Sequence, residues 1–176
     1  MLKVAVLVAV AVSTTAHADG IVAVGGMAGF APRSGVGAGT IEVGVPVAGG
    51  WLAHAMAAGG SASDFDILSK SATSGSFSQL RGGFGYRYSR KPGRSFELGV
   101  DVGHQHVEWS GTEWGFLGGG PSDVSYHHDD YIAVPRLVGA LGAPDSSLEL
   151  RVGFETAFAQ RGWAGADFTL GLGFRL

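Results

Sequence analysis

The stretch ADFTLGLGFRL, from Ala166 to Leu176, decides the fold class. From Phe168 onward, every second residue is large and apolar, whereas the residues between them are small, polar or charged. A period of two places the apolar side chains on one face of a β-strand and the remaining side chains on the other. The sequence therefore predicts a final amphipathic strand, and the fold depends on which solvent meets its apolar face.

The same alternation recurs along the chain, for example in TIEVGVPV (40–47), SFELGVDVG (95–103) and LELRVGFETAF (148–158). Amphipathic strands separated by turn signals predict an all-β domain. We place strands near 20–31, 37–47, 50–60, 75–89, 95–109, 130–142, 147–161 and 164–176. Long loops are expected near 61–74 and 110–129, and the other connections are short. The predicted fold is an eight-stranded antiparallel up-and-down β-barrel.

The N-terminal residues have the form of a secretory signal peptide. Lys3 provides a positive charge, an apolar run extends from Val4 to Val12, and Ala16-His17-Ala18 forms a small-x-small cleavage site. The apolar run is much shorter than the roughly 20 residues of a transmembrane helix. We expect a signal peptide at 1–18 and a mature β-barrel domain at 19–176, exported from the cytoplasm.

Composition excludes several classes of protein. The chain has 0 Cys, so disulfides and thiol chemistry are absent. Its formal net charge of −3 provides no basic field for nucleic acid, and we expect no nucleic-acid partner.

Two kinds of barrel could cover the apolar faces of the alternating strands. A soluble secreted barrel that binds a small lipid, as a lipocalin does, encloses its apolar face, whereas a transmembrane barrel turns that face to lipid. The charged face combines many glycines with nearly balanced charge, as a narrow lumen that must pair its charges requires. The sequence predicts an interior polar network of Glu42, Arg81, Arg87, Glu97, Asp101, Arg136, Glu149, Arg151, Glu155 and Arg175, with Asp167 on the same face. The lipocalin-like barrel stays open as an alternative.

Aromatic residues near the predicted strand ends favour the membrane barrel, since such barrels carry aromatic girdles at both interfaces. The predicted girdle comprises Trp51, Tyr86, Tyr88, Phe96 and Phe174 at one rim and Trp109, Tyr131 and Trp163 at the other.

With these features, the whole mature chain resembles the small outer-membrane β-barrel proteins of Gram-negative bacteria, which have the OmpA-type transmembrane fold. The stretch YIAVPRLVGAL, from Tyr131 to Leu141, is similar to a strand common in the outer membrane protein β-barrel domain family. In that family the final residue is most often Phe. Here it is Leu176, with Phe174 two residues earlier.

The resemblance implies that the last strand closes the barrel against the first and that both termini are periplasmic. Expected partners are outer-membrane lipid, lipopolysaccharide and, through the C-terminal strand, the barrel-insertion machinery. We expect a monomer without a cofactor, with a polar plugged interior, a structural or surface-interaction role and no catalysis.

Histidines and acidic residues gather at the predicted outer ends of the fifth and sixth strands. His104, His106, His127 and His128 are metal candidates, since neighbouring strands could bring imidazoles within ligand distance of zinc or copper. No fixed metal motif is present, and the expectation is a solvated rim that faces lipopolysaccharide. HQHVEWS (104–110) and SYHHDD (125–130) also permit a third reading, a lipid A-modifying hydrolase that uses Ser, His and an acid.

Overall fold

The computed structural model describes residues 20–31, 34–64, 74–114 and 120–176. The predicted signal peptide lies outside these residues. The strands are β1 (Ile21–Ala31), β2 (Ser34–Ala48), β3 (Trp51–Asp64), β4 (Ser74–Lys91), β5 (Arg94–Trp114), β6 (Pro121–Gly142), β7 (Leu148–Ala159) and β8 (Gly162–Arg175). None of the described residues belongs to a helix long and apolar enough to cross a membrane.

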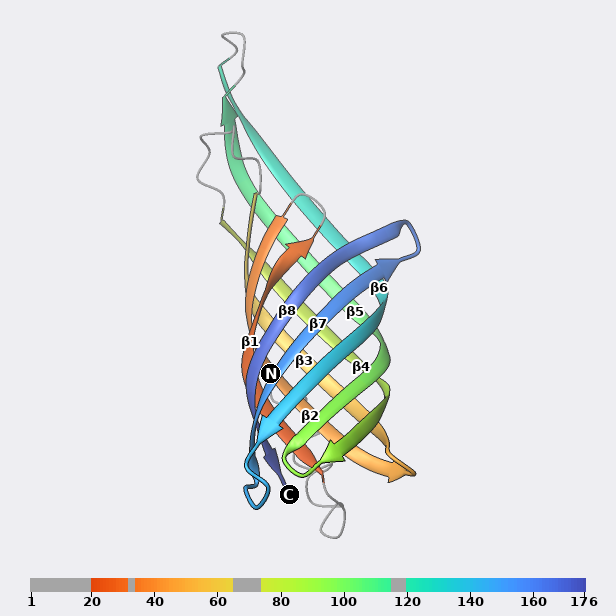
Figure 1. Cartoon of the computed structure of the whole chain (residues 1–176). Coiled ribbons are helices and arrows are strands. Elements are labelled where there is room, and N and C mark those ends of the chain that lie inside the picture. Colours follow the sequence, from red (N-terminus) through yellow and green to blue (C-terminus); the bar gives the residue numbers. More distant parts are fainter. Residues whose placement is uncertain (1–19, 32–33, 65–73, 115–119) are drawn as a thin grey trace.

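The eight strands form one closed barrel in chain order, so the predicted eight-stranded antiparallel fold is confirmed (Figure 1). Each strand pairs antiparallel with the next, and β8 pairs with β1 from Ile21↔Arg175 to Phe30↔Ala166. The pairing of β8 with β1 satisfies backbone N–H and C=O groups of the first and last strands. In an open sheet these two strands would be unpaired edges. We call the end where β1 starts and β8 finishes the terminal end, and the opposite end the hairpin end.

Turns at the terminal end are tight. Gly49 and Gly50 join β2 to β3 with φ angles of 57° and 87°, a region that favours glycine. The β4–β5 turn is similar, with Gly93 at a φ angle of 74°. These turns fix the register of their hairpins and thereby which face of each strand points inward.

Strands β5 and β6 are the longest of the described strands and project beyond the barrel wall (Figure 1). They pair along their whole length up to Trp114↔Pro121, whereas β6 pairs with β7 only from Ile132 to Gly142. The predicted loop at 110–129 is therefore wrong, because residues 110–114 and 121–129 are strand. Of the loop predicted near 61–74, residues 61–64 and 74 are strand, and 65–73 lie outside the described residues.

The barrel interior has two zones. Toward the terminal end it is filled by buried charged side chains, among them Arg136, Asp101 and Glu155. Toward the hairpin end it is filled by an apolar cluster of Met27, Ala31, Val36, Met56, Ala58, Ala62, Phe77, Val107 and Trp109. The predicted polar interior therefore describes the first zone, whereas the second zone is apolar.

The outer surface toward the terminal end is an apolar belt. Its members are exposed Phe, Leu, Val and Tyr side chains such as Phe84, Leu98, Val102 and Leu170. On β6 the apolar outer face runs from Tyr131 to Leu141, which matches the roughly 9–11 residues of a tilted transmembrane strand. A soluble barrel that encloses lipid would need the reverse arrangement, so the lipocalin-like alternative does not fit.

Candidate functional site

Arg136 on β6 is the centre of the interior network. Its Nη2 donates to Glu42 Oε1 at 2.7 Å, and its Nη1 lies 3.1 Å from His54 Nδ1. The same Nη1 is 3.5 Å from Asp101 Oδ2. These partners come from β2, β3 and β5, so one guanidinium joins strands on different sides of the lumen.

Arg81 and Arg151 extend the network along the barrel axis. Arg81 pairs with Glu155 and places its Nε 3.2 Å from Asp101 Oδ2. Arg151 donates from Nη1 to Glu149 Oε1 at 2.9 Å and from Nη2 to Glu42 Oε1 at 3.1 Å. Guanidinium groups suit this role because their planar donors can engage several carboxylates at once.

Glu149 connects the buried network to the terminal end. Arg87 Nη2 donates to Glu149 Oε2 at 2.7 Å, and Arg175 Nε lies 3.4 Å from the same oxygen. All ten residues assigned to the interior network from the sequence thus make at least one ion pair with another member. Asp167 is also buried on this face.

Sequence reasoning missed His54, which is buried beside Arg136, Glu97 and Asp101. Its strand, GWLAHAMAAGG, alternates alanine with other small or apolar residues, so its inner face gives little polar signal. His54 and Glu42 lie on the same inner face of neighbouring strands, because Gly44 is opposite His54 and Glu42 is opposite Met56. This relation can be recognised only when the register between β2 and β3 is known.

Inward-facing glycines leave room for these long side chains. A Cβ at Gly85 would lie 2.9 Å from Glu97 Oε1, and one at Gly173 would lie 2.8 Å from Arg151 Cδ. Long charged side chains packed into the positions that glycine vacates fill the lumen, which in an eight-stranded barrel is only wide enough for side chains.

The polarity of the two faces reverses along β5. On the outer face, Val102 is followed by His104, His106 and Glu108. On the inner face, Asp101 is followed by Gln105, Val107 and Trp109, all three of them buried. The reversal marks the level at which lipid outside the wall gives way to water, because above it the hairpin follows the rule of a soluble protein.

The assignment of Trp109 to the aromatic girdle is wrong, because this side chain is only 5% exposed and lies inside the barrel mouth. Its Nε1 donates to Ser34 Oγ at 2.8 Å, and its ring stacks on Tyr126 with a centroid distance of 5.6 Å. Above the polarity reversal an inward aromatic ring is buried in a water-excluded core, where the indole N–H needs a partner.

The other aromatic residues assigned to the girdle lie on the outer surface. Trp51 contacts Tyr86 edge to face near the terminal end, with ring centroids 5.6 Å apart. Tyr131, which is 78% exposed, contacts His104 in the same way at the upper edge of the belt. The remaining exposed members are Tyr88, Phe96, Trp163 and Phe174.

The four histidine candidates separate onto two faces of the hairpin. His104 and His106 face outward, and both lie near Asp129, with His104 Nε2 2.9 Å from Asp129 Oδ1. His128 instead pairs with Asp130, and its ring stacks on Tyr126. His106, Glu108 and His127 form a compact group with ligand atoms within 4.8 Å of one another. This group excludes His104 and His128.

The serines that the hydrolase hypothesis would need are not placed for it. Ser110 and Ser125 are exposed and pair with each other across β5 and β6. Among the hydrogen bonds of the described hairpin residues, none joins either hydroxyl to a histidine. Neither of these two serines therefore has the neighbouring base that would activate a nucleophile.

The chain is similar in structure to several solved barrels. Ail, the attachment invasion locus protein of Yersinia pestis, is 10% identical with a TM-score of 0.61, covering 90% of this chain and 99% of that chain. Neisserial surface protein A is 10% identical with a TM-score of 0.55, covering 89% and 95%. A major outer membrane protein from Thermus thermophilus is 13% identical with a TM-score of 0.53, covering 89% and 99%. A further structure of Ail is a complex with the heparin analogue sucrose octasulfate.

No protein-family model and no curated protein sequence matches the chain. At these identities the similarity shows the fold, and the fold agrees with the apolar belt and the filled lumen. The class is therefore defined: the chain has the closed eight-stranded fold of the small outer-membrane β-barrel proteins.

Proposed function

We propose that this protein is a monomeric outer-membrane barrel with a structural or surface-interaction role, a plugged interior and no catalytic activity. The observation that carries the proposal is the combination of an apolar outer belt with a lumen filled by ion pairs. An apolar belt is stable only in lipid. A lumen crossed by ion pairs such as Arg136 to Glu42 and Arg151 to Glu149 holds the strands together and resists the passage of solutes.

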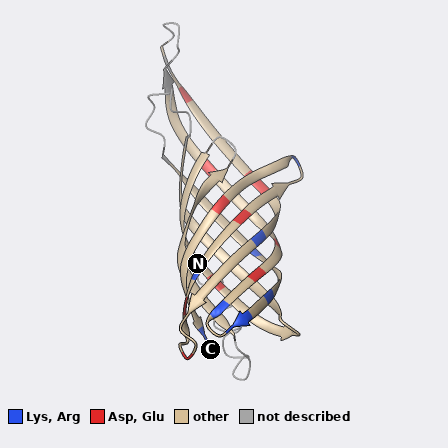
Figure 2. Cartoon of the chain, in the orientation of Figure 1, with Lys and Arg blue, Asp and Glu red and all other residues tan. Residues whose placement is uncertain are grey.

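The proposal includes an orientation. Both termini face the periplasm, and the projecting β5–β6 hairpin stands on the outer side, where lipopolysaccharide is its first neighbour. Most of the described Lys and Arg residues lie toward the terminal end (Figure 2). From Ser95 to Pro135 the chain carries acidic residues but no Lys or Arg.

The absence of basic residues from the hairpin affects which ligands we propose. Sucrose octasulfate is a polyanion, and we do not extend this ligand of Ail to the hairpin of this chain, since the hairpin offers no guanidinium or ammonium group to bind sulfate. The proposed contacts are the acyl chains of outer-membrane lipid along the belt and the barrel-insertion machinery along the C-terminal strand β8.

Cell fractionation with a gel of boiled and unboiled membrane extract tests the proposal. We expect the protein in the outer membrane, with faster migration when unboiled, because a closed barrel stays compact in detergent until it is heated. Recordings in planar lipid bilayers should show no steady conductance from the filled lumen. A soluble periplasmic protein without the mobility shift would overturn the membrane assignment, and a steady open channel would overturn the plug.

A further inference from the structure

Two neighbouring cross-strand pairs on the outer face of the hairpin bring ligand-type side chains together. His106 of β5 is opposite Asp129 of β6, and Glu108 of β5 is opposite His127 of β6. Directly opposite residues on one face have Cβ atoms about 4.5–5.5 Å apart. The β-ladder therefore holds four adjacent metal-binding side chains on one surface without any loop.

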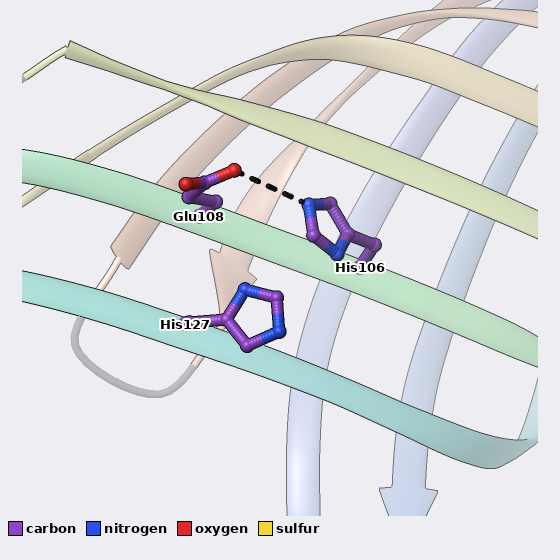
Figure 3. Close-up of side chains that lie close together, drawn as sticks. All are labelled: His106, Glu108 and His127. Carbon is purple, nitrogen blue, oxygen red and sulfur yellow. Dashed lines mark ion pairs between the residues drawn. The ribbon is translucent and has the colours of Figure 1, made fainter.

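Three of these side chains converge (Figure 3). His106 Nε2 lies 3.7 Å from Glu108 Oε2, and the rings of His106 and His127 have centroids 5.1 Å apart at an interplanar angle of 69°. The donor atoms of a tetrahedral zinc site with bonds of about 2.1 Å are about 3.4 Å apart. Small rotations of the exposed Glu108 and His127 side chains would close the remaining distance.

Asp129 places a carboxylate near the second ring nitrogen of His106. Its Oδ1 lies 3.6 Å from His106 Nδ1 and 2.9 Å from His104 Nε2. A small rotation of either side chain would bring this carboxylate within hydrogen-bond distance of Nδ1, where it would stabilise the proton on that nitrogen and leave Nε2 free to bind a metal. Histidine ligands of zinc commonly have such a carboxylate partner on the second ring nitrogen.

We propose that His106, Glu108 and His127 bind one Zn²⁺ ion on the outer face of the hairpin, with Asp129 as a positioning residue. Two imidazoles and one carboxylate suit zinc, whereas Mg²⁺ and Ca²⁺ prefer oxygen ligands alone. The fourth position stays open to water or to a donor from outside the chain. The acidic charge of the hairpin also favours a cation.

The position of the site makes it accessible. On β5 it begins four residues beyond Val102, the last apolar residue of the outer belt on that strand. Its residues therefore lie above the lipid level and in contact with the medium. In the orientation proposed above, the metal would reach the site directly from the medium outside the cell. It would not have to pass through the filled lumen.

Isothermal titration calorimetry with ZnCl₂ tests the inference, with the full protein purified in zwitterionic detergent and without a histidine tag. We expect saturation at one ion per chain. His106→Ala and His127→Ala should each weaken binding at least about tenfold, because each removes a ligand. His128→Ala is the matched control, since His128 is the next residue along β6 but faces inward, and it should bind zinc as the unaltered protein does.

Two further variants keep the test independent of folding. Glu108→Gln preserves the shape of the side chain but removes its charge and should also weaken binding, and Asp129→Asn should weaken it by about 10–100-fold through His106. Each variant is first checked for the mobility shift of a folded barrel. No saturable zinc binding, or equal loss in His128→Ala and His127→Ala, would overturn the zinc site. Neither result would affect the proposed outer-membrane role, which the fractionation tests separately.

Discussion

At the scale of the residue, Arg136 has more carboxylate neighbours than any other cation among the described residues. It is buried and lies within ion-pair distance of Glu42, Glu97, Asp101 and Glu155, all of which are withdrawn from bulk water. Taking charges out of water has a high free-energy cost, which only close pairing offsets. Arg136 therefore stabilises the barrel mainly by preventing several carboxylates from being buried without a partner.

Replacing this one cation should destabilise the barrel strongly. For Arg136→Met we expect a loss of about 3–5 kcal/mol in the free energy of unfolding, the usual cost of breaking a buried ion pair from one side. Urea unfolding of the protein in lipid vesicles, followed by tryptophan fluorescence, measures the loss. Arg90→Met changes an exposed arginine of β4 and should cost less than about 1 kcal/mol. Equal losses in the two variants would contradict the role given to Arg136.

At the scale of the element, glycine determines how closely neighbouring strands and their side chains approach. Gly83 faces the lumen on β4, opposite Asp101 of β5. A Cβ at this position would overlap the Val100 carbonyl oxygen and come within 2.5 Å of Asp101 Oδ1. The β4–β5 ladder therefore relies on the absence of a side chain at Gly83 to hold Asp101 where Arg81 and Arg136 can reach it.

Adding a methyl group should lower the free energy of unfolding at an inward-facing glycine of the barrel wall more than at an outward-facing one. Gly83→Ala should lower the free energy of unfolding by about 1–3 kcal/mol, as overpacking of a filled interior does. Gly139→Ala places the same methyl group on β6, where a Cβ would approach the Val152 carbonyl oxygen only to 3.9 Å, and should change stability little. Urea titration of both variants in the same vesicles makes the comparison. A neutral Gly83→Ala would mean that the ladder can shift at no cost.

Sequence reasoning was most accurate where lipid meets the strand. Between Tyr131 and Leu141 the outer face is apolar and the inner face contains Arg136, so the pattern identifies both the strand and its orientation. It failed above the lipid level, where the outer face of the strands contacts water instead of lipid. The exposed residues Ser110, Asp123, Ser125, His127 and Asp129 are polar there, and glycine, serine and aspartate imitate a loop, although backbone pairing continues up to Trp114↔Pro121. Trp109 has the same parity along β5 as the inward-facing Glu97 and Asp101, so the period of two itself places its ring inside the barrel.

At the scale of the whole molecule, the polarity reversal divides one continuous wall into two parts. Below the reversal the barrel has an apolar exterior and a charged interior, and above it β5 and β6 have a polar exterior over an apolar cluster. A transmembrane strand needs only about 9–11 residues, and β5 has 21. The excess length forms a rigid surface outside the lipid that the barrel anchors.

The orientation can be tested because the chain has 0 Cys, so single cysteines report on single positions. Ser125→Cys places a thiol on the exposed outer face of β6, and Asp145→Cys places one in the β6–β7 turn at the terminal end. Intact cells treated with a membrane-impermeant maleimide should label Ser125→Cys but not Asp145→Cys. Both should be labelled after the outer membrane is disrupted. The opposite pattern would place the termini outside the cell.

Strand β6 pairs with β5 over more of its length than with β7, which affects how two copies of the protein could contact each other in a membrane. Among the described strands, β7 pairs with β6 only from Ile132 onward, so the earlier part of β6 has a strand neighbour on its β5 side alone. Such an edge can template addition of a strand from another molecule. Asp123, Asp129 and Asp130 lie along this edge, and two copies that approached edge to edge would bring like charges together. We expect this repulsion between copies to oppose strand addition at that edge.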